Sequence, residues 1–307
     1  MPLVSLIGMY KPANEQKYAI GQFNVNNLEF IQSALEAAAE MKSPIILAAS
    51  TSAIKYAGID YLVSIVRTGA SKMSAPVALH LDHGATIEDA QKCIDAGFTS
   101  VMIDASHHPL EENIRITKEV VKLAHPKNIA VEAELGRLGG IEDNVSVAEK
   151  EAILTDPDQA VRFVKESGCD ALAVAVGTSH GAYKFKGEAR LAFDRINEIK
   201  ERVKIPLVLH GASGVGQGLL DKAQKYGAKL PGAKGVPDEA YKHAIALGIN
   251  KINIDTDLRL AWVGAVREAL TLKPEVFDPR KILGPAREAV KKVIIEKMKL
   301  FGSAGKG

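Results

Sequence analysis

Three histidines that are far apart in the sequence each fall at or just beyond the end of a short apolar run. His83 and His210 lie at the ends of two such runs, and His180 lies shortly after a third. Imidazole nitrogens with carboxylate neighbours suit Zn2+, with other divalent ions as alternatives. Three protein ligands leave one coordination position open, as a catalytic metal requires. We therefore predict that these histidines bind one metal ion, although a single histidine is more often structural or solvated.

Carboxylates occupy the ends of the neighbouring apolar runs. Asp104 and Glu134 are candidates for a second metal position or for support of the histidines. Glu132 is two residues before Glu134, so both side chains point to the same face of a strand. Glu132 is therefore expected to support the metal ligands. The alternative for each carboxylate is plain solvation at the surface.

The other histidines are assigned by their spacing. His80 lies three residues before His83, so on a regular strand the two side chains point to opposite faces and do not share a metal. His80 shares a face with Asp82 and is interpreted as a packed or orienting group. The remaining histidines are expected at the surface: His107, His108, His125 and His243.

Two segments rich in small residues follow late apolar runs. They are 177–181 and 211–214. Exposed backbone N–H groups in such loops form anion-binding concavities. Glycine-containing turns are common, so the motif alone is weak. The position of 211–214 directly after His210 favours phosphate binding.

The elements that must position these residues alternate between strand and helix. Near-continuous apolar runs are typical of parallel strands that are covered on both faces. The runs are Tyr18–Phe23, Pro44–Ser50, Pro76–His83, Ser100–Ser106, Ile129–Gly136, Ala171–Val176, Pro206–Gly211 and Lys251–Asp257. Helical spacing of apolar residues predicts helices over Leu28–Met41, with Asn27 as N-cap, and over Glu111–Ala124 and Leu258–Leu270.

Eight strand–helix units without a break in composition predict an α/β fold, a single (β/α)8 TIM barrel over residues 1–307. We expect an extra C-terminal helix over Pro285–Leu300 and long loops after strands 5 and 6. A doubly wound open sheet is the alternative, but it is expected to carry a glycine-rich dinucleotide loop, and none is found. In a barrel, the C-terminal ends of the strands hold the chemistry.

Composition excludes several classes of function. The 307 residues include 39 basic and 37 acidic ones, well mixed, so nucleic acid is not favoured as a partner. The sequence contains no apolar run of about 18 residues, so no membrane span is predicted. The first ten residues do not resemble a signal peptide. Cys93 and Cys169 are widely separated, as expected for free thiols in the cytoplasm.

Several motifs together resemble the class II fructose-1,6-bisphosphate aldolases. They occur in the family's order and spacing at 77–84, 131–136, 177–181, 209–213, 253–257 and 277–280. The resemblance implies reversible cleavage of fructose 1,6-bisphosphate to dihydroxyacetone phosphate and glyceraldehyde 3-phosphate. It also implies Zn2+, a second divalent position, a monovalent cation and a homo-oligomer, either a dimer or a tetramer.

Catalytic roles follow from the same resemblance. His83, His180 and His210 match the zinc ligands, and Asp104 and Glu134 match the second metal position. Asp82 matches the acid/base at the C4 oxygen. Glu142 matches the residue that transfers a proton at C3, with Glu149 as its rival.

The resemblance also implies a set of substrate contacts. Positions for the dihydroxyacetone phosphate half are Gly181, Gly211, Ala212, Ser213, Asn253, Ile254, Asp255 and Thr256. Lys184 is a further candidate for substrate binding. Ser50 matches a contact to the other half. Arg259 and Arg280 match charges for the second phosphate, with Arg280 reaching from a partner subunit.

Three other functions are weighed against this one. An aldolase for tagatose 1,6-bisphosphate would share metal and mechanism and differ at C4. A metal-dependent hydrolase on the same barrel would often carry a His-x-His pair after the first strand, where 21–25 has no histidine. A non-catalytic binding barrel is disfavoured because every proposed ligand and acid/base residue is present.

Overall fold

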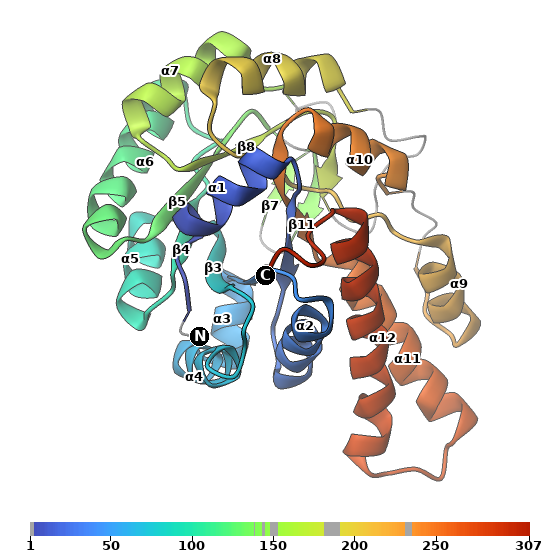
Figure 1. Cartoon of the computed structure of the whole chain (residues 1–307). Coiled ribbons are helices and arrows are strands. Elements are labelled where there is room, and N and C mark those ends of the chain that lie inside the picture. Colours follow the sequence, from blue (N-terminus) through green and yellow to red (C-terminus); the bar gives the residue numbers. More distant parts are fainter. Residues whose placement is uncertain (1–2, 138, 143–144, 148–152, 181–190, 231–234) are drawn as a thin grey trace.

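The computed structural model describes residues 3–137, 139–142, 145–147, 153–180, 191–230 and 235–307 (Figure 1). Eight parallel strands close into a barrel in the order β1-β11-β10-β8-β5-β4-β3-β2, which confirms the predicted fold class. The strands are β1 (Ile20–Asn24), β2 (Ile45–Ser50), β3 (Val77–Gly84), β4 (Ser100–Ile103), β5 (Ala130–Leu135), β8 (Ala171–Val174), β10 (Leu207–Leu209) and β11 (Ile249–Ile254). Each predicted apolar run overlaps one of them.

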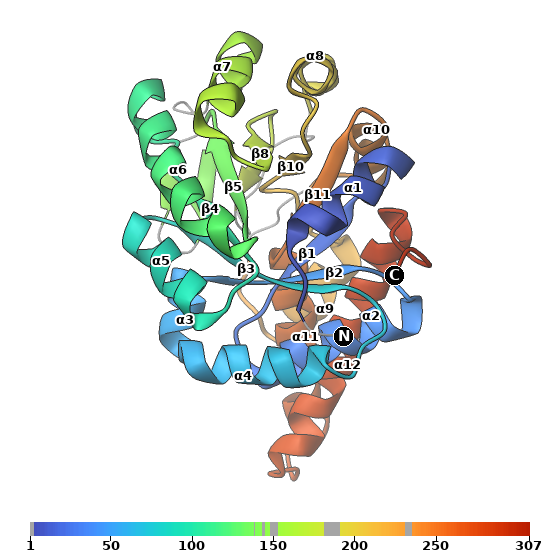
Figure 2. The same ribbon diagram turned by 60° about the vertical axis from the view of Figure 1, so that its left-hand side comes forward.

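Helices surround this barrel (Figures 1 and 2). They are α1 (Leu6–Gln16), α2 (Leu28–Met41), α3 (Thr51–Ala57), α4 (Ile59–Ala70), α5 (Ile87–Ala96), α6 (Leu110–Ala124), η1 (His125–Lys127), α7 (Pro157–Ser167), α8 (Phe193–Val203), α9 (Gln217–Lys225), α10 (Asp238–Ala246), α11 (Thr256–Leu272) and α12 (Pro279–Leu300). Helix α2 has the predicted bounds, and the Asn27 side chain accepts from the Phe30 N–H at 3.0 Å. Within the described ranges, no helix is both long and apolar enough to cross a membrane.

The hydrophobic core has two main parts. The larger part lies between the strands and the outer helices. The second fills the N-terminal end of the barrel, where Leu6, Met9 and Tyr10 of α1 pack against Ile20 and Ile46. Figure 1 shows α1 lying across this opening. Apolar side chains close the N-terminal end of the barrel. The buried polar side chains of the interior therefore lie toward the C-terminal end.

The predicted long loops contain strands of their own. Strands β6 (Gly139–Glu142), β7 (Val145–Val147) and β9 (Ser179–His180) form a small sheet in the order β7-β6-β9. In this sheet Gly140 pairs with His180. The segments that follow β5 and β8 are therefore held together at the C-terminal end of the barrel.

The C-terminal helices form an arm that extends beyond the barrel. Figures 1 and 2 both show α11 and α12 projecting together, with their connection at the far end. Helix α12 begins at Pro279, earlier than the predicted start at Pro285, because Asp278 caps its first turn by accepting from the Arg280 N–H at 2.9 Å.

Candidate functional site

The upper interior of the barrel is polar although it is buried. Alternate residues of four strands point inward there, and all of these side chains are less than 10% exposed. They are Gln22 and Asn24 on β1, His80 and Asp82 on β3, Glu132 and Glu134 on β5, and Lys251 and Asn253 on β11. Buried polar groups need partners, so their contacts define the site.

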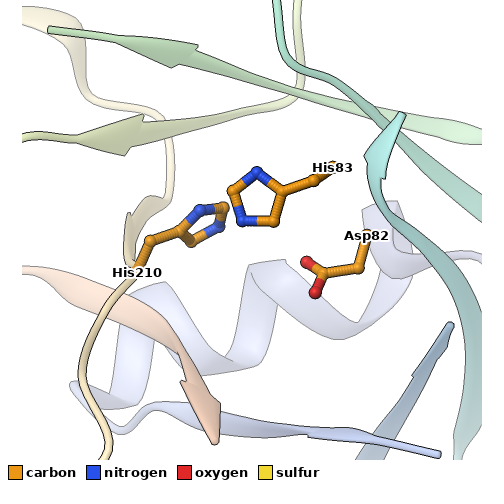
Figure 3. A group of neighbouring side chains, drawn as sticks. All are labelled: Asp82, His83 and His210. Atoms are coloured by element: carbon orange, nitrogen blue, oxygen red, sulfur yellow. The ribbon is translucent and has the colours of Figure 1, made fainter. Parts of the chain in front are cut away.

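The structure brings two of the three predicted metal-binding histidines together (Figure 3). His83 and His210 have ring centroids 4.7 Å apart. With Asp82 they form a group whose ligand atoms all lie within 4.8 Å of one another. His180 lies in β9, where its backbone pairs with Gly140 of β6 in the small sheet. Its side chain is outside the described set.

His83 reaches this group through an unusual backbone conformation. Its φ is 48°, and the β3–β4 register shifts between Leu81 and Gly84. A regular strand would turn the side chains of Asp82 and His83 to opposite faces. The left-handed residue lets both contribute to one group.

A second group shares His83 and adds two predicted carboxylates. His83, Asp104 and Glu134 have ligand atoms within 4.8 Å of one another. The His83 Nδ1 lies 2.9 Å from Asp104 Oδ2, and the Ser106 hydroxyl donates to Asp104 Oδ1 at 2.7 Å. Burial opposes the charge of Asp104, but these partners hold the pKa of its carboxyl below the usual range.

Neighbouring carboxylates raise the pKa values of His83 and His210. Burial alone would lower the pKa of His83, but nearby Asp82, Asp104 and Glu134 raise it well above its ordinary value. Burial likewise opposes the charge of His210, while hydrogen bonding to glutamates raises its pKa to about 9. Both rings are therefore protonated near neutral pH without a metal and must lose protons to bind one.

His210 is held between two glutamates of β5. Its Nε2 lies 2.9 Å from Glu132 Oε1, and its Nδ1 lies 3.1 Å from Glu134 Oε2. A carboxylate accepts only, so both nitrogens of the protonated ring carry hydrogen, and Nε2 keeps its hydrogen on Glu132 when a metal displaces the other one. The Nδ1 is then the nitrogen available to a metal, because it faces the side of the ring where the second group lies.

Asp82 is oriented by three side-chain amides. Gln22 Nε2 donates to its Oδ1 at 3.0 Å, Asn24 Nδ2 to its Oδ2 at 2.8 Å, and Asn253 Nδ2 to its Oδ1 at 3.1 Å. These donors come from the adjacent strands β1 and β11. Sequence reasoning missed Gln22 and Asn24, which could have been found as two polar residues at alternate positions inside an apolar run.

A buried ion pair beneath the histidines was also missed. Lys251 Nζ lies 2.8 Å from Glu132 Oε2, and both side chains are at most 1% exposed. Burial acts against the charge of Glu132, but Lys251 and His210 hold the pKa of its carboxyl well below the usual range. His80 behaves oppositely, since burial and then Lys251 lower its pKa to about 3. Neutral His80 contacts Ser100 Oγ at 2.9 Å, in agreement with the packed role predicted for it.

The predicted phosphate loop is fixed to the start of α11. Asp257 accepts from the N–H groups of Gly214 at 3.0 Å and Val215 at 2.6 Å. The Asp255 N–H donates to Ser213 Oγ at 3.3 Å. Tyr241 donates its hydroxyl to the carbonyl of Ala212, which is buried. The segment 211–215 is therefore held in one shape beside His210.

Of the other predicted substrate residues, some lie at the ends of elements beside the site and one has its side chain in the outer core. Ser50 pairs with Asp82 in the β2–β3 register and caps α3, while Thr256 opens α11. Ile254 is fully buried in the outer core, so its side chain does not line the site; a strand residue next to inward-facing Asn253 must point outward.

The two predicted arginines lie outside the barrel interior. Arg259 forms an ion pair with Asp255 at 2.6 Å and is 47% exposed. Arg280 is at the start of α12, on the arm, where it is 89% exposed and contacts Asp278 at 2.9 Å.

Some predictions fall outside the described residues. Gly181, Lys184 and the rival Glu149 are among these. Glu142 lies in β6, where its backbone pairs with Val145, but its side chain is not described. The surface histidines His107, His108 and His243 are exposed as expected, and His125 lies 3.0 Å from Asp170.

The donor set suits a divalent metal ion. Imidazole nitrogens and carboxylate oxygens converge from β3, β4, β5 and the end of β10, and the two groups have His83 in common. Mixed nitrogen and oxygen ligands of this kind bind first-row divalent ions. The arrangement can therefore hold a Lewis-acidic ion next to a hydrogen-bonded carboxylate.

Comparison with known proteins identifies one family. The model of the family "Fructose-bisphosphate aldolase class-II", whose members depend on a metal, matches residues 4–230 and 229–306. The chain is 51% identical over 308 residues to a fructose-bisphosphate aldolase of Giardia intestinalis, covering 99% of this chain and 94% of that protein. It is 52% identical over 304 residues to one of Thermus caldophilus, covering 99% of both.

Solved structures are similar over the same length. The YdjI aldolase of Escherichia coli K12 aligns with a TM-score of 0.80 at 36% identity, covering 99% of each chain. A putative fructose-1,6-bisphosphate aldolase of Coccidioides immitis aligns with a TM-score of 0.82 at 30% identity, covering 98% of this chain and 96% of that one.

Proposed function

Because the chain belongs to the class-II fructose-bisphosphate aldolase family, we propose that it reversibly cleaves fructose 1,6-bisphosphate into dihydroxyacetone phosphate and glyceraldehyde 3-phosphate. The observation that carries the proposal is the group formed by Asp82, His83 and His210 at the C-terminal end of the barrel. It places a hydrogen-bonded carboxylate next to histidines that suit a metal. Cleavage of a β-hydroxy ketone needs such a base together with an electron sink at the carbonyl.

The metal is proposed to be Zn2+, held by His83, His180 and His210. A Zn2+ ion bound there would supply Lewis acidity at the ketone oxygen, worth several kcal/mol. Asp104 and Glu134 are proposed to provide a second divalent position, since they share His83 with the first. A monovalent cation near the loops after β8 and β10 completes the proposed set.

Proton transfer is assigned to two carboxylates. Asp82 removes the proton of the C4 hydroxyl, the C3–C4 bond breaks, and the electron pair passes toward the ketone. The amides of Gln22, Asn24 and Asn253 keep the Asp82 oxygens directed during this step. Glu142 then delivers a proton to C3, with Glu149 as the alternative donor.

Phosphate binding is assigned to the loop after β10 and the start of α11. The backbone from Gly211 to Ser213 and the segment 253–256 are proposed to hold the dihydroxyacetone phosphate half, together with Gly181 and Lys184. Ser50 is proposed to contact the other half, and Arg259 its phosphate. Arg280 is proposed to reach that phosphate from a second copy of the chain, which makes the enzyme a dimer or tetramer.

The proposed setting is the cytoplasm, with residues 1–307 as one domain. Cys93 and Cys169 are both free and buried, as expected in a reducing compartment. The continuous outer core runs from Ala19 to Phe301, which supports one folding unit. A small sugar bisphosphate, rather than nucleic acid, is the proposed partner.

A coupled cleavage assay on two sugars tests the function. We expect turnover of fructose 1,6-bisphosphate, loss of activity with a chelator, and recovery on addition of Zn2+. Tagatose 1,6-bisphosphate, which differs only at C4, is the matched substrate and is expected to react more slowly. Faster turnover of tagatose 1,6-bisphosphate would assign the alternative aldolase, and no cleavage of either sugar would contradict the proposal.

A further inference from the structure

A chain of buried hydrogen bonds joins the proposed metal ligand to the proposed base. His210 Nε2 donates to Glu132 Oε1 at 2.9 Å, and Lys251 Nζ donates to the same oxygen at 2.9 Å. Lys251 Nζ also donates to Asn253 Oδ1 at 3.0 Å, and Asn253 Nδ2 donates to Asp82 Oδ1 at 3.1 Å. The chain passes through β5 and β11 and connects the two halves of the site.

Lys251 fixes the direction of the hydrogen bonds toward Asp82. An ammonium group only donates, whereas an amide both donates and accepts. Because Lys251 donates to the carbonyl oxygen of Asn253, the amide nitrogen must face Asp82. The Asp82 carboxylate only accepts and so favours the same orientation, but without the lysine the Asn253 amide would be held from one side alone.

Glu132 fixes the direction at the other end. A carboxylate accepts only, so when a metal takes the place of the hydrogen on Nδ1, the remaining hydrogen of His210 is held on Nε2. Lys251 keeps Glu132 in this form, because its Nζ lies 2.8 to 2.9 Å from both carboxylate oxygens. One lysine thus acts on the tautomer of His210 and on the amide that holds Asp82.

Stability alone is a weak explanation for this ion pair. Lys251 and Glu132 are at most 1% exposed. Replacing a buried ion pair with apolar side chains is often neutral or stabilising. Helix α1 closes the barrel below the pair, where Tyr10 donates to Glu132 Oε2 at 3.4 Å. A functional role for the pair is therefore expected through the groups that it contacts on the side of the site, His210 and Asn253.

We propose that Lys251 and Glu132 are positioning residues that set the hydrogen-bond direction at both the metal ligand His210 and the base Asp82. The proposal rests on the proposed function of this site. The pair touches neither metal nor substrate in this assignment. Its effect must therefore appear in metal affinity and in the catalytic step together.

The test is the double variant Glu132→Gln/Lys251→Met, which removes both charges and leaves no buried charge without a counterion. Glutamine can present its NH2 group to His210 and so move the ring hydrogen to the nitrogen that binds metal. Zinc affinity of the metal-free protein is measured by competition with a chromogenic chelator. We expect it to fall by about 10–100-fold, as for other partners of metal-binding histidines.

A kinetic measurement at saturating zinc forms the second readout. We expect kcat to fall by about 10-fold or more with KM little changed, because the loss lies in the orientation of Asp82 rather than in substrate binding. Tyr10→Phe is the matched control. It removes a buried hydrogen bond to the Glu132 carboxylate but leaves the hydrogen bonds between His210, Glu132, Lys251, Asn253 and Asp82 in place. It is expected to keep zinc affinity, kcat and KM within about twofold of the original.

The outcomes separate the two proposals. A folded double variant that behaves like Tyr10→Phe in both readouts overturns the positioning role. If the double variant does not fold, Lys251→Gln is measured in its place, and the same fall in kcat is expected because its amide can also let Asn253 rotate. An unmodified protein that binds no zinc at His83 and His210, or cleaves no sugar bisphosphate, contradicts the proposed function instead.

Discussion

Asp82 and His83 are neighbours in the sequence, yet their ligand atoms lie within 4.8 Å of each other and of His210. The left-handed backbone of His83, with a φ of 48°, makes this arrangement compatible with a strand. The same residue belongs to the group with Asp104 and Glu134. The conformation of one residue therefore links the proposed base, the proposed zinc position and the proposed second metal position.

Substitution of His83 should separate its backbone role from its side-chain role. His83→Asn and His83→Ala are both expected to lose zinc and activity. Asparagine tolerates the left-handed region better than alanine, so we expect the metal-free His83→Asn protein to be more stable by about 1 kcal/mol. Urea unfolding with metal analysis checks this. Equal or reversed stabilities would mean that the backbone at residue 83 relaxes after substitution.

Asp82→Asn should distinguish a base from a metal ligand. As the base, Asp82 is dispensable for metal binding, so the variant should keep its zinc while kcat falls by about 10²–10⁴-fold. Loss of charge also weakens the three amide contacts. Steady-state kinetics and zinc content after gel filtration provide the measurement. A variant that loses zinc together with activity would assign Asp82 to the metal.

The stability of the metal-free protein should fall as the pH rises above neutral. The pKa of His210 is raised from 6.5 to about 9, mainly because hydrogen bonds to Glu132 and Glu134 outweigh burial. A raised pKa stabilises the fold below 6.5, and this contribution is lost as the pH rises through 9. The loss from His210 is up to about 3 kcal/mol.

Urea unfolding in a chelator between pH 6 and 9.5 measures this loss. His83 acts in the same direction, because its pKa is also raised. Zinc addition at pH 7 should release protons into a weakly buffered solution, since both rings must be neutral to bind the ion. Unfolding free energy that rises over this range, or zinc uptake without proton release, would show that the histidines are neutral in the metal-free state.

Asp257→Asn should weaken phosphate binding with little effect on the chemical step. The carboxylate holds the N–H groups of Gly214 and Val215, and Lys297 lies 3.3 Å from it. We expect KM to rise by about 10-fold with a smaller change in kcat. Lys297→Met leaves both backbone contacts in place and should raise KM less. Equal KM values for the two variants and the original would exclude a role of the loop shape in binding.

Arg280→Ala should reveal whether the arm completes a neighbouring site. Arg280 is 89% exposed and projects from the start of α12. We expect a KM increase of about 10-fold or more, as for loss of a charged phosphate contact. Mixing Arg280→Ala with inactive Asp82→Asn chains should restore the original KM at part of the sites. If no fraction of the sites in the mixture shows the original KM, the active site is not shared between two chains.

Local sequence patterns were sufficient for the barrel. Apolar runs located all eight strands because parallel strands are buried on both faces, and Asn27 located the start of α2. The strands inside the loops after β5 and β8 were not predicted, because short glycine-containing segments lack an apolar pattern.

The hydrogen-bond network of the site was beyond local patterns. Gln22, Asp82 and Asn253 meet only because the barrel closes β1 against β11 and places β3 on the other side of β2 from β1. Lys251 was read as part of an apolar run, and its pairing with Glu132 depends on strands 119 residues apart in the sequence. The turn at His83 could not be seen either, because nothing in the residue itself requires a positive φ.

Anomalous diffraction at the zinc absorption edge, on crystals of the zinc-loaded protein, tests the central claim most directly. We predict one strong peak about 2.0–2.1 Å from an imidazole nitrogen of each of His83, His180 and His210. At His210 the bonded nitrogen should be Nδ1. A zinc ion bound elsewhere, or imidazoles of these three residues too far apart to share one ion, would contradict it.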